Sequence, residues 1–147
     1  MPENSGNLPD WTHVWPVRVY FEDTDAGGVV YYANYLKFAE RARTEMLRAG
    51  GIDHGRLAKA HGVQIVVRSC AIDFLMPARL DDALEVRSRI VTMGGASFSI
   101  RQEVYRAETR LAVADVKLAC VDEDLRPTRL PAPLKQHLEP YKSHKTI

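Results

Sequence analysis

One amphipathic stretch, residues 34–49, constrains the fold of this chain more than any other feature. Its apolar residues recur at steps of three and four positions, the spacing that aligns side chains along one face of an α-helix. They are Tyr35, Phe38, Ala39, Ala42, Met46 and Ala49. We expect Asn34 to cap the start of this helix and Gly50-Gly51 to provide a left-handed exit. A helix of about four turns with one apolar face must pack against another layer of structure.

The segments before and after this helix have the patterns of β-strands, which predicts a sheet as that layer. Apolar and polar residues alternate at 17–22, 84–92, 98–105 and 112–120, and β-branched residues fill 63–74. Gly94-Gly95 and the segment 108–110 predict hairpins, which join antiparallel neighbours. Short helices are expected at 53–61 and 134–138. The sequence therefore predicts an α+β fold in which a mainly antiparallel five-stranded sheet packs against the long helix.

The chain of 147 residues is most simply one domain, and its apolar fraction of 46% is enough for a core without metal or disulfide support. We predict a flexible N-terminal tail at 1–14, a single domain at 15–139 and a polar C-terminal tail at 140–147. The early prolines and polar residues do not match a signal peptide, and no stretch approaches the ~18 apolar residues of a membrane span. No transmembrane segment is therefore expected.

The charge balance and the cysteine content indicate which partners and which cellular compartment to expect. Lys and Arg number 20 against 19 Asp and Glu, for a net charge of +1, and no basic stripe is present. Nucleic-acid binding is therefore not expected. Cys70 and Cys120 lie in apolar runs without a CxxC motif, which predicts buried free thiols and a reducing compartment. These features favour a cytoplasmic protein.

The loop before the long helix contains the candidate chemistry. It holds two carboxylates, Asp23 and Asp25, followed by Gly27 and Gly28. A carboxylate beside a helix N-terminus can act as a base or a nucleophile, while unpaired backbone N–H groups stabilise charge on a substrate oxygen. An aspartate in such a turn can also simply hydrogen-bond the next N–H groups. The five histidines show no metal-ligand spacing, so no metal site is predicted.

Two separated motifs resemble a known family. The first runs Glu22-Asp-Thr-Asp-Ala-Gly-Gly-Val-Val-Tyr31 and continues through Asn34-Tyr35-Leu36 and Glu40-Arg-Ala-Arg-Thr-Glu45. It resembles the hotdog-fold acyl-CoA thioesterases of the 4-hydroxybenzoyl-CoA thioesterase type. The second, Pro77-Ala-Arg-Leu-Asp-Asp-Ala-Leu84, is similar to the branch associated with the Tol-Pal system. The resemblance extends from about Trp15 to Pro131.

The resemblance implies a hotdog fold, in which the antiparallel sheet wraps the long helix, and a homodimer or a dimer of dimers. It implies that Asp25, the second acid of the D-x-D-x-x-G motif, is catalytic and that the backbone N–H of Tyr32 polarises the thioester carbonyl. Asp23 is then structural. The Tol-Pal branch usually has histidine where this chain has Tyr32, so an imidazole role is absent there, although a backbone donor is unaffected.

We therefore predict an acyl-CoA thioesterase that releases CoA and a carboxylic acid, with Asp25 as nucleophile or general base. No cofactor is expected beyond the CoA of the substrate. Gly27, Gly28, Tyr31 and Tyr35 are predicted to contact the substrate, and the aromatic residues favour an aromatic acyl group. The alternative is a non-catalytic module that binds acyl-CoA or acyl carrier protein and serves envelope or lipid proteins. The sequence leaves open the acyl group, the CoA phosphate contacts and the physiological partner.

Overall fold

The computed structural model describes residues 8–9 and 11–142 of the chain. Five strands form one sheet in the order β1-β3-β4-β5-β2, with every neighbouring pair antiparallel. The strands are β1 (His13–Arg18), β2 (Gln64–Phe74), β3 (Ala83–Met93), β4 (Ser97–Arg106) and β5 (Thr109–Val121). The helices are α1 (Asn34–Arg48), α2 (His54–His61) and α3 (Ala132–Leu138), and two short 3₁₀ turns are η2 (Phe21–Asp23) and η3 (Glu139–Tyr141).

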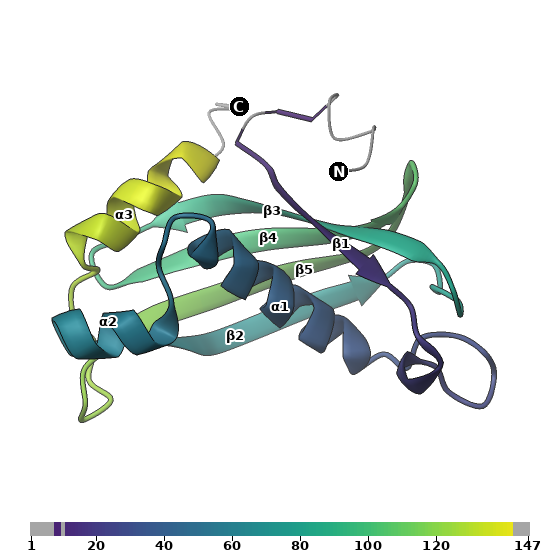
Figure 1. The fold of residues 1–147 in the computed structure, drawn as a ribbon, viewed down its shortest axis with the longest axis horizontal. Helices are drawn as coiled ribbons and strands as arrows, with labels where there is room; N and C mark the ends of the chain where they lie inside the picture. The colour runs from purple at the N-terminus through teal and green to yellow at the C-terminus, as the bar shows by residue number, and fades with distance from the viewer. Residues whose placement is uncertain (1–7, 10, 143–147) are drawn as a thin grey trace.

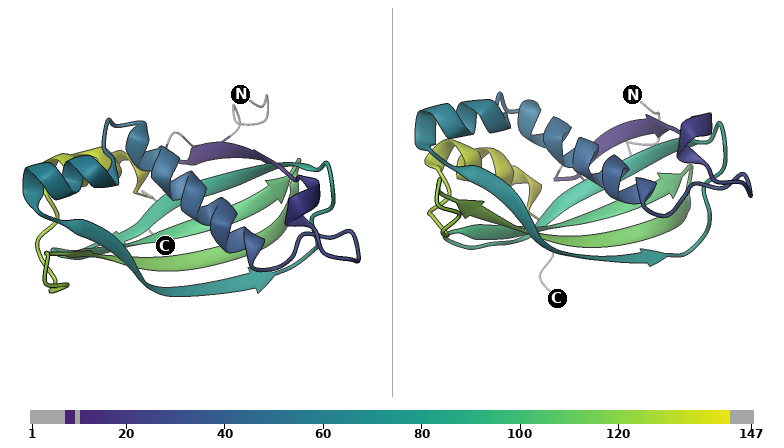
Figure 2. Two further views of the ribbon diagram at one scale, coloured as in Figure 1. Left: turned by 60° about the horizontal axis from the view of Figure 1, so that its bottom comes forward. Right: turned by 90° about the horizontal axis from the view of Figure 1, so that it is seen from below.

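Helix α1 lies across one face of the curved sheet, and α2 and α3 cover the same end of that face (Figures 1 and 2). The second half of α1 packs in one apolar cluster with α2, α3, β4 and β5, where Met46 and Leu134 are fully buried. Its first half packs in another with β1 and β3, around Phe38 and Val86. This is the predicted α+β arrangement of a five-stranded antiparallel sheet wrapped around one long helix.

The alternation of residues 98–105 is confirmed, and it places one polar side chain in the core. Phe98, Ile100 and Val104 are buried, as their spacing predicts. Gln102 shares their face of the sheet and has no exposed surface, and Ser88 on β3 is equally buried beside it. A buried amide is costly unless it is hydrogen-bonded, so this position needs partners on the helix that covers it.

The first strand differs from its prediction. The alternation at 17–22 predicted a strand through Phe21, but β1 ends at Arg18, and Phe21 is 81% exposed in the turn η2. The Tyr20 N–H donates to the Asp23 carboxylate at 2.8 Å, and the Asp23 N–H returns to the Tyr20 carbonyl at 3.0 Å. These local bonds replace the sheet ladder and turn the chain toward the loop.

The predicted domain limits lie close to the ends of the described structure. His13 and Val14, within the predicted tail 1–14, pair with β3 as the first residues of β1. Tyr141, within the predicted tail 140–147, belongs to η3. The rest of these predictions falls partly on residues 1–7, 10 and 143–147, which lie outside the described part of the chain.

The two ends of α1 are closed differently from the prediction. The N-cap is Ala33, which makes no side-chain cap, while Asn34 is the first helical residue and donates its Nδ2–H to the Asp23 carbonyl at 2.8 Å. At the other end Gly51 adopts the left-handed conformation, with φ of +74°, but Gly50 does not. Gly50 is required for space instead, because a Cβ there would overlap the ring of His137.

The sheet has two contrasting edges. Strand β1 has six residues and contains Pro16, whereas β2 has 11 residues and no proline. Most of β2 is exposed in the isolated chain, including Val67 and Phe74. Cys70 on this strand is also exposed, which corrects its predicted burial, while Cys120 is buried, and both are free thiols. A long, exposed edge strand is the usual place for another strand to pair.

Candidate active site at the start of helix α1

The loop between η2 and α1 is a tight turn centred on Asp25. The Asp25 N–H donates to the Val29 carbonyl at 2.9 Å, and the Gly28 N–H donates to the Asp25 carbonyl at 3.0 Å. Gly28 has φ of +80°, a conformation that costs little only for glycine. The Val30 N–H then joins the loop to the Ala78 carbonyl at 2.8 Å. The backbone of the turn is thus fixed to the connection between β2 and β3 before α1 begins.

Asp23 holds this loop against the helix. Its carboxylate accepts from Tyr20, as described above, and its carbonyl accepts from the Tyr31 N–H at 3.0 Å and from the Asn34 side chain at 2.8 Å. One carboxylate oxygen and the backbone carbonyl of Asp23 therefore take part in bonds that hold the loop together. The purely structural role of Asp23 stays a prediction.

Asp25 is more exposed than Asp23. Its side chain is exposed, and its Oδ1 accepts from the Gly27 N–H at 2.8 Å. Among the described residues, no group donates to Oδ2. A Cβ on Gly27 would lie 3.3 Å from Oδ1, so the glycine lets the backbone come close to the carboxylate. Asp25 is oriented through one oxygen and leaves the other open for water or for a substrate carbonyl.

The start of α1 presents unpaired donors to the same loop. The N–H groups of Asn34 and Tyr35 donate to the Tyr31 and Tyr32 carbonyls at 2.9 and 3.2 Å. Within the described residues, neither the Tyr32 nor the Ala33 N–H donates a hydrogen bond. The first N–H groups of a helix carry its partial positive charge, which suits an oxygen that gains negative charge.

The aromatic residues near the loop divide into two groups. Tyr31 and Tyr32 are 47% and 62% exposed, and their ring centroids lie 4.9 Å apart. Tyr35 is only 3% exposed, and its hydroxyl accepts from the Ala78 N–H at 3.1 Å. Burial raises the pKa of the Tyr35 phenol, although the Ala78 hydrogen bond partly opposes this. Tyr35 thus belongs to the core rather than to the open surface of the loop.

Phe74, at the end of β2, also belongs to this aromatic surface, and the sequence did not indicate it. Its ring packs edge-on against Tyr32 at 6.2 Å and against Tyr35 at 5.3 Å. Phe74 is 48% exposed. The only signal was an aromatic residue at the end of a predicted strand, which periodicity alone does not distinguish from core packing.

Across residues 8–9 and 11–142, no group of three or more His, Cys, Asp or Glu side chains is arranged to hold a metal ion. The prediction that the site uses neither a metal nor an organic cofactor stays a prediction. No helix in the same described ranges combines the length and the apolar character needed to cross a membrane.

An antiparallel five-stranded sheet wrapped around one long helix is the arrangement of a hotdog fold. A family model described as "Thioesterase-like superfamily" matches residues 19–138. The chain therefore belongs to the thioesterase-like superfamily. This confirms the family resemblance, the fold and the class of enzyme predicted from the sequence, a thioester hydrolase.

Individual relatives agree with this assignment. The chain is 50% identical over 119 residues to "Acyl-CoA thioester hydrolase YbgC" of Escherichia coli, which covers 80% of this chain and 88% of that protein. It is 44% identical over 122 residues to "Acyl-CoA thioesterase YbgC" of Haemophilus influenzae, covering 82% of this chain and 90% of the relative. A crystal structure described as a probable thioesterase from Bartonella henselae matches with a TM-score of 0.77 and 40% identity, over 82% of this chain and 99% of that one.

Proposed function

We propose that this protein hydrolyses acyl-CoA thioesters to free CoA and a carboxylic acid, with Asp25 as the reacting carboxylate. The names of the two YbgC relatives support the substrate class. The observation that carries the proposal is the contrast within one loop. Asp25 is exposed, and among the described residues its second oxygen has no donor, whereas Asp23 is half-buried and its carbonyl binds both Tyr31 and Asn34.

Two routes fit this geometry. In the first, the open Asp25 oxygen attacks the thioester carbonyl, the C–S bond breaks to release CoA thiolate, and water then hydrolyses the mixed anhydride. In the second, Asp25 takes a proton from a water molecule that attacks the carbonyl directly, and the C–S bond breaks in the same way. Both routes place negative charge on the carbonyl oxygen. The Tyr32 N–H stabilises it, and one such donor is typically worth ~10²–10³ in rate.

The other substrate contacts in this proposal are assigned from how exposed each residue is. Gly27 and Gly28 let the thioester approach the loop backbone, and the exposed rings of Tyr31 and Phe74 border the approach. Tyr35, which was predicted to contact the acyl group, acts through core packing in this proposal. The cytoplasmic location, and the acyl carrier protein or envelope-associated partners implied by the resemblance, stay predictions.

We also propose that the active form is a homodimer paired through β2, alone or within a dimer of dimers. Pro16 and the short length of β1 disfavour pairing at that edge, because proline lacks the N–H that a new strand would use. The open β2 edge carries exposed apolar residues, among them Val67 and Phe74. Light scattering at micromolar concentration should give at least twice the mass of one chain. Val67→Lys should reduce it, and a monomeric unmodified protein would rule the dimer out.

The enzyme is tested by thiol release from a panel of acyl-CoAs that differ in length and aromaticity. Hydrolysis produces one free thiol for each acyl-CoA consumed. A binding module would form a complex but leave the thioester intact, and that result would establish the alternative function. Equal kcat/KM values for benzoyl-CoA and butanoyl-CoA would remove the predicted preference for aromatic acyl groups.

A further inference from the structure

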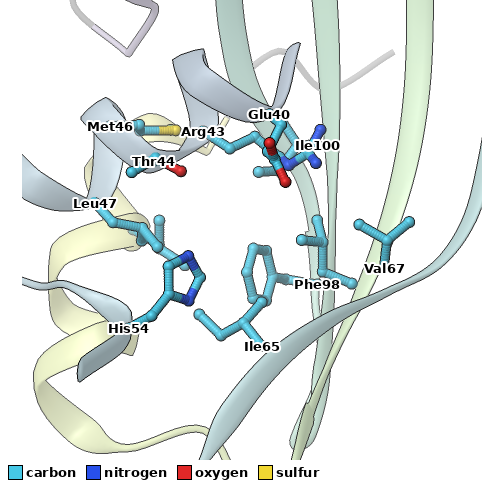
Figure 3. Close-up of a pocket in the computed structure, with 12 residues that line it drawn as sticks. Glu40, Arg43, Thr44, Met46, Leu47, His54, Ile65, Val67, Phe98 and Ile100 are labelled. Carbon is cyan, nitrogen blue, oxygen red and sulfur yellow. The ribbon is translucent and has the colours of Figure 1, made fainter. Parts of the chain in front are cut away.

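A cavity of ≈ 90 Å³ lies beneath the second half of α1, away from the Asp25 loop. Its walls are mostly apolar and come from α1, β2, β4 and β5, and they include Ile65, Phe98 and Leu118. Four polar side chains border it: Glu40, Arg43, Thr44 and His54. Figure 3 shows Glu40 and Arg43 at one end of the cavity, His54 at the other, and Phe98 between them. An apolar cavity with a few convergent polar groups is the usual form of a small-molecule site.

The buried glutamine of β4 fixes Arg43 at this cavity. Gln102 Oε1 accepts from Arg43 Nη1 at 2.9 Å, while its Nε2 donates to the Ala39 carbonyl at 2.9 Å and to Ser88 Oγ at 3.0 Å. The amide nitrogen thus orients the glutamine, and its oxygen holds Arg43. Elsewhere in the described residues, no carboxylate lies within ion-pair distance of the guanidinium. An arginine has five N–H donors, so several remain for a ligand.

Burial lowers the pKa of the Arg43 guanidinium, and the nearby Cys70 and Glu40 oppose this effect. Removing a guanidinium from water without a carboxylate partner is unfavourable, and a ligand that accepts hydrogen bonds would relieve the cost. Glu40 lies at the same end of the cavity and provides an acceptor. The pair therefore matches a hydroxyl group, which both donates and accepts one hydrogen bond.

A track of residues on one side of α1 lies between this cavity and the Asp25 loop. Leu36 and Glu40 lie four residues apart on the same side of α1, and Tyr32 precedes Leu36 by four residues just before the helix begins. Leu36 is 48% exposed. Strand β2 borders this side: Phe74 contacts Tyr32 at one end, and Val67 lines the cavity at the other. Ten residues separate the N-cap Ala33 from Arg43, about 15 Å along the helix. A short acyl group cannot reach from the loop to the cavity, but an extended long chain can.

We infer that the cavity binds the distal end of a long acyl chain, and that Arg43 and Glu40 select chains with a hydroxyl group at that end. This inference rests on the proposed function, because the chain enters from a thioester held at Asp25. The open side of the track lies along the β2 edge, where the proposed second copy pairs. Arg43 is then a specificity-determining residue, and Gln102 is its positioning residue.

The test compares kcat/KM for butanoyl-, dodecanoyl- and ω-hydroxydodecanoyl-CoA. The unmodified enzyme should favour dodecanoyl- over butanoyl-CoA, and the ω-hydroxy substrate over dodecanoyl-CoA by about tenfold, the effect expected of one hydrogen bond to a charged group. Arg43→Met should abolish the second preference. Arg41→Met, a neighbouring exposed arginine outside the cavity, should keep it. Equal values for both dodecanoyl substrates in the unmodified enzyme would overturn the inference.

Two further measurements keep the inference testable if a variant does not fold or if the enzyme shows no turnover. Ile65→Trp fills the cavity from a partly buried position on the edge strand and should lower kcat/KM for dodecanoyl-CoA at least tenfold more than for butanoyl-CoA. Calorimetric titration with ω-hydroxydodecanoic acid and dodecanoic acid measures the affinity of each acid for the protein without any hydrolysis. Tighter binding of the hydroxy acid without thiol release from any substrate would refute the proposed function alone. Equal binding of the two acids would refute the cavity's selectivity.

Discussion

The two ends of helix α1 have opposite hydrogen-bonding states. At the C-terminal end the chain closes on itself: the Ala49, Gly50 and Gly51 N–H groups bond to helix carbonyls at 2.9–3.0 Å. His137 Nε2 also lies 2.6 Å from the Met46 carbonyl, which it satisfies as a donor. At the N-terminal end, the Tyr32 and Ala33 N–H groups have no acceptor among the described residues. The C-terminal end of α1 is thus closed by hydrogen bonds, whereas the N-terminal end keeps donors that a ligand can use.

The largest effect should come from Asp25→Asn. Asparagine keeps the size of the side chain and can still accept from the Gly27 N–H, so the loop and substrate binding should survive. It loses the negative charge that either route requires, so kcat should fall by at least ~10², with a much smaller change in KM. Thiol-release kinetics and circular dichroism check activity and folding.

Asp23→Asn is the matched control, two residues away in the same loop. It weakens the bond to the Tyr20 N–H and should lower Tm while leaving kcat within a few-fold of the unmodified enzyme. A folded Asp25→Asn enzyme with near-normal kcat would contradict the mechanism. A greater loss of kcat from Asp23→Asn would show that the wrong acid of the pair had been assigned.

At the closed end, Gly50→Ala should chiefly affect stability. The new Cβ overlaps the His137 ring and must displace α3 or break the His137 contact with Met46, which should cost ~1–3 kcal/mol of unfolding free energy. Gly51→Ala is the comparison, because no atom of the described residues lies within 4 Å of the added Cβ and only the φ of +74° is strained. Denaturant unfolding should rank Gly50→Ala as the more destabilised variant. The reverse order would mean that α3 moves freely.

Helix α1 and its surroundings also show which features the sequence could predict and which it could not. The period of the apolar residues specified α1 nearly to the residue, because a helix and a sheet must each bury one face. The D-x-D-x-x-G motif indicated Asp25 through family resemblance. Arg43 and Phe74 were not found, because their roles depend on contacts between segments far apart in the chain. Gln102 was the sequence feature that could have indicated Arg43. A glutamine on the buried face of a strand requires a polar partner across the core.

A smaller effect tests how closely the loop controls Asp25. In Gly27→Ala the new Cβ lies 3.3 Å from Asp25 Oδ1, so the carboxylate must shift by a few tenths of an ångström, and kcat should fall several-fold. In Gly28→Ala the added Cβ has no neighbour within 4 Å in the described part of the chain, but φ is +80°, so the strain should cost ~1–2 kcal/mol of stability. Kinetics and melting curves should therefore separate the two variants. Equal kcat values would show that Asp25 tolerates this displacement.

The smallest predicted effect is a pH dependence at the closed end. His13 packs edge-on against Tyr141, and its buried Nδ1 has no hydrogen-bond partner among residues 8–9 and 11–142. Burial and the nearby His137 lower the pKa of His13 from its ordinary value of 6.5, while Glu45 opposes them. The unfolded chain therefore takes up the proton first, so the free energy of unfolding should fall as the pH drops below 6.5. His13→Phe keeps the ring contact and removes the titration, so its Tm should decline less than that of the unmodified protein between pH 7.5 and 5.5. Parallel declines in Tm would assign the acid sensitivity to other groups and leave His13 a packing residue only.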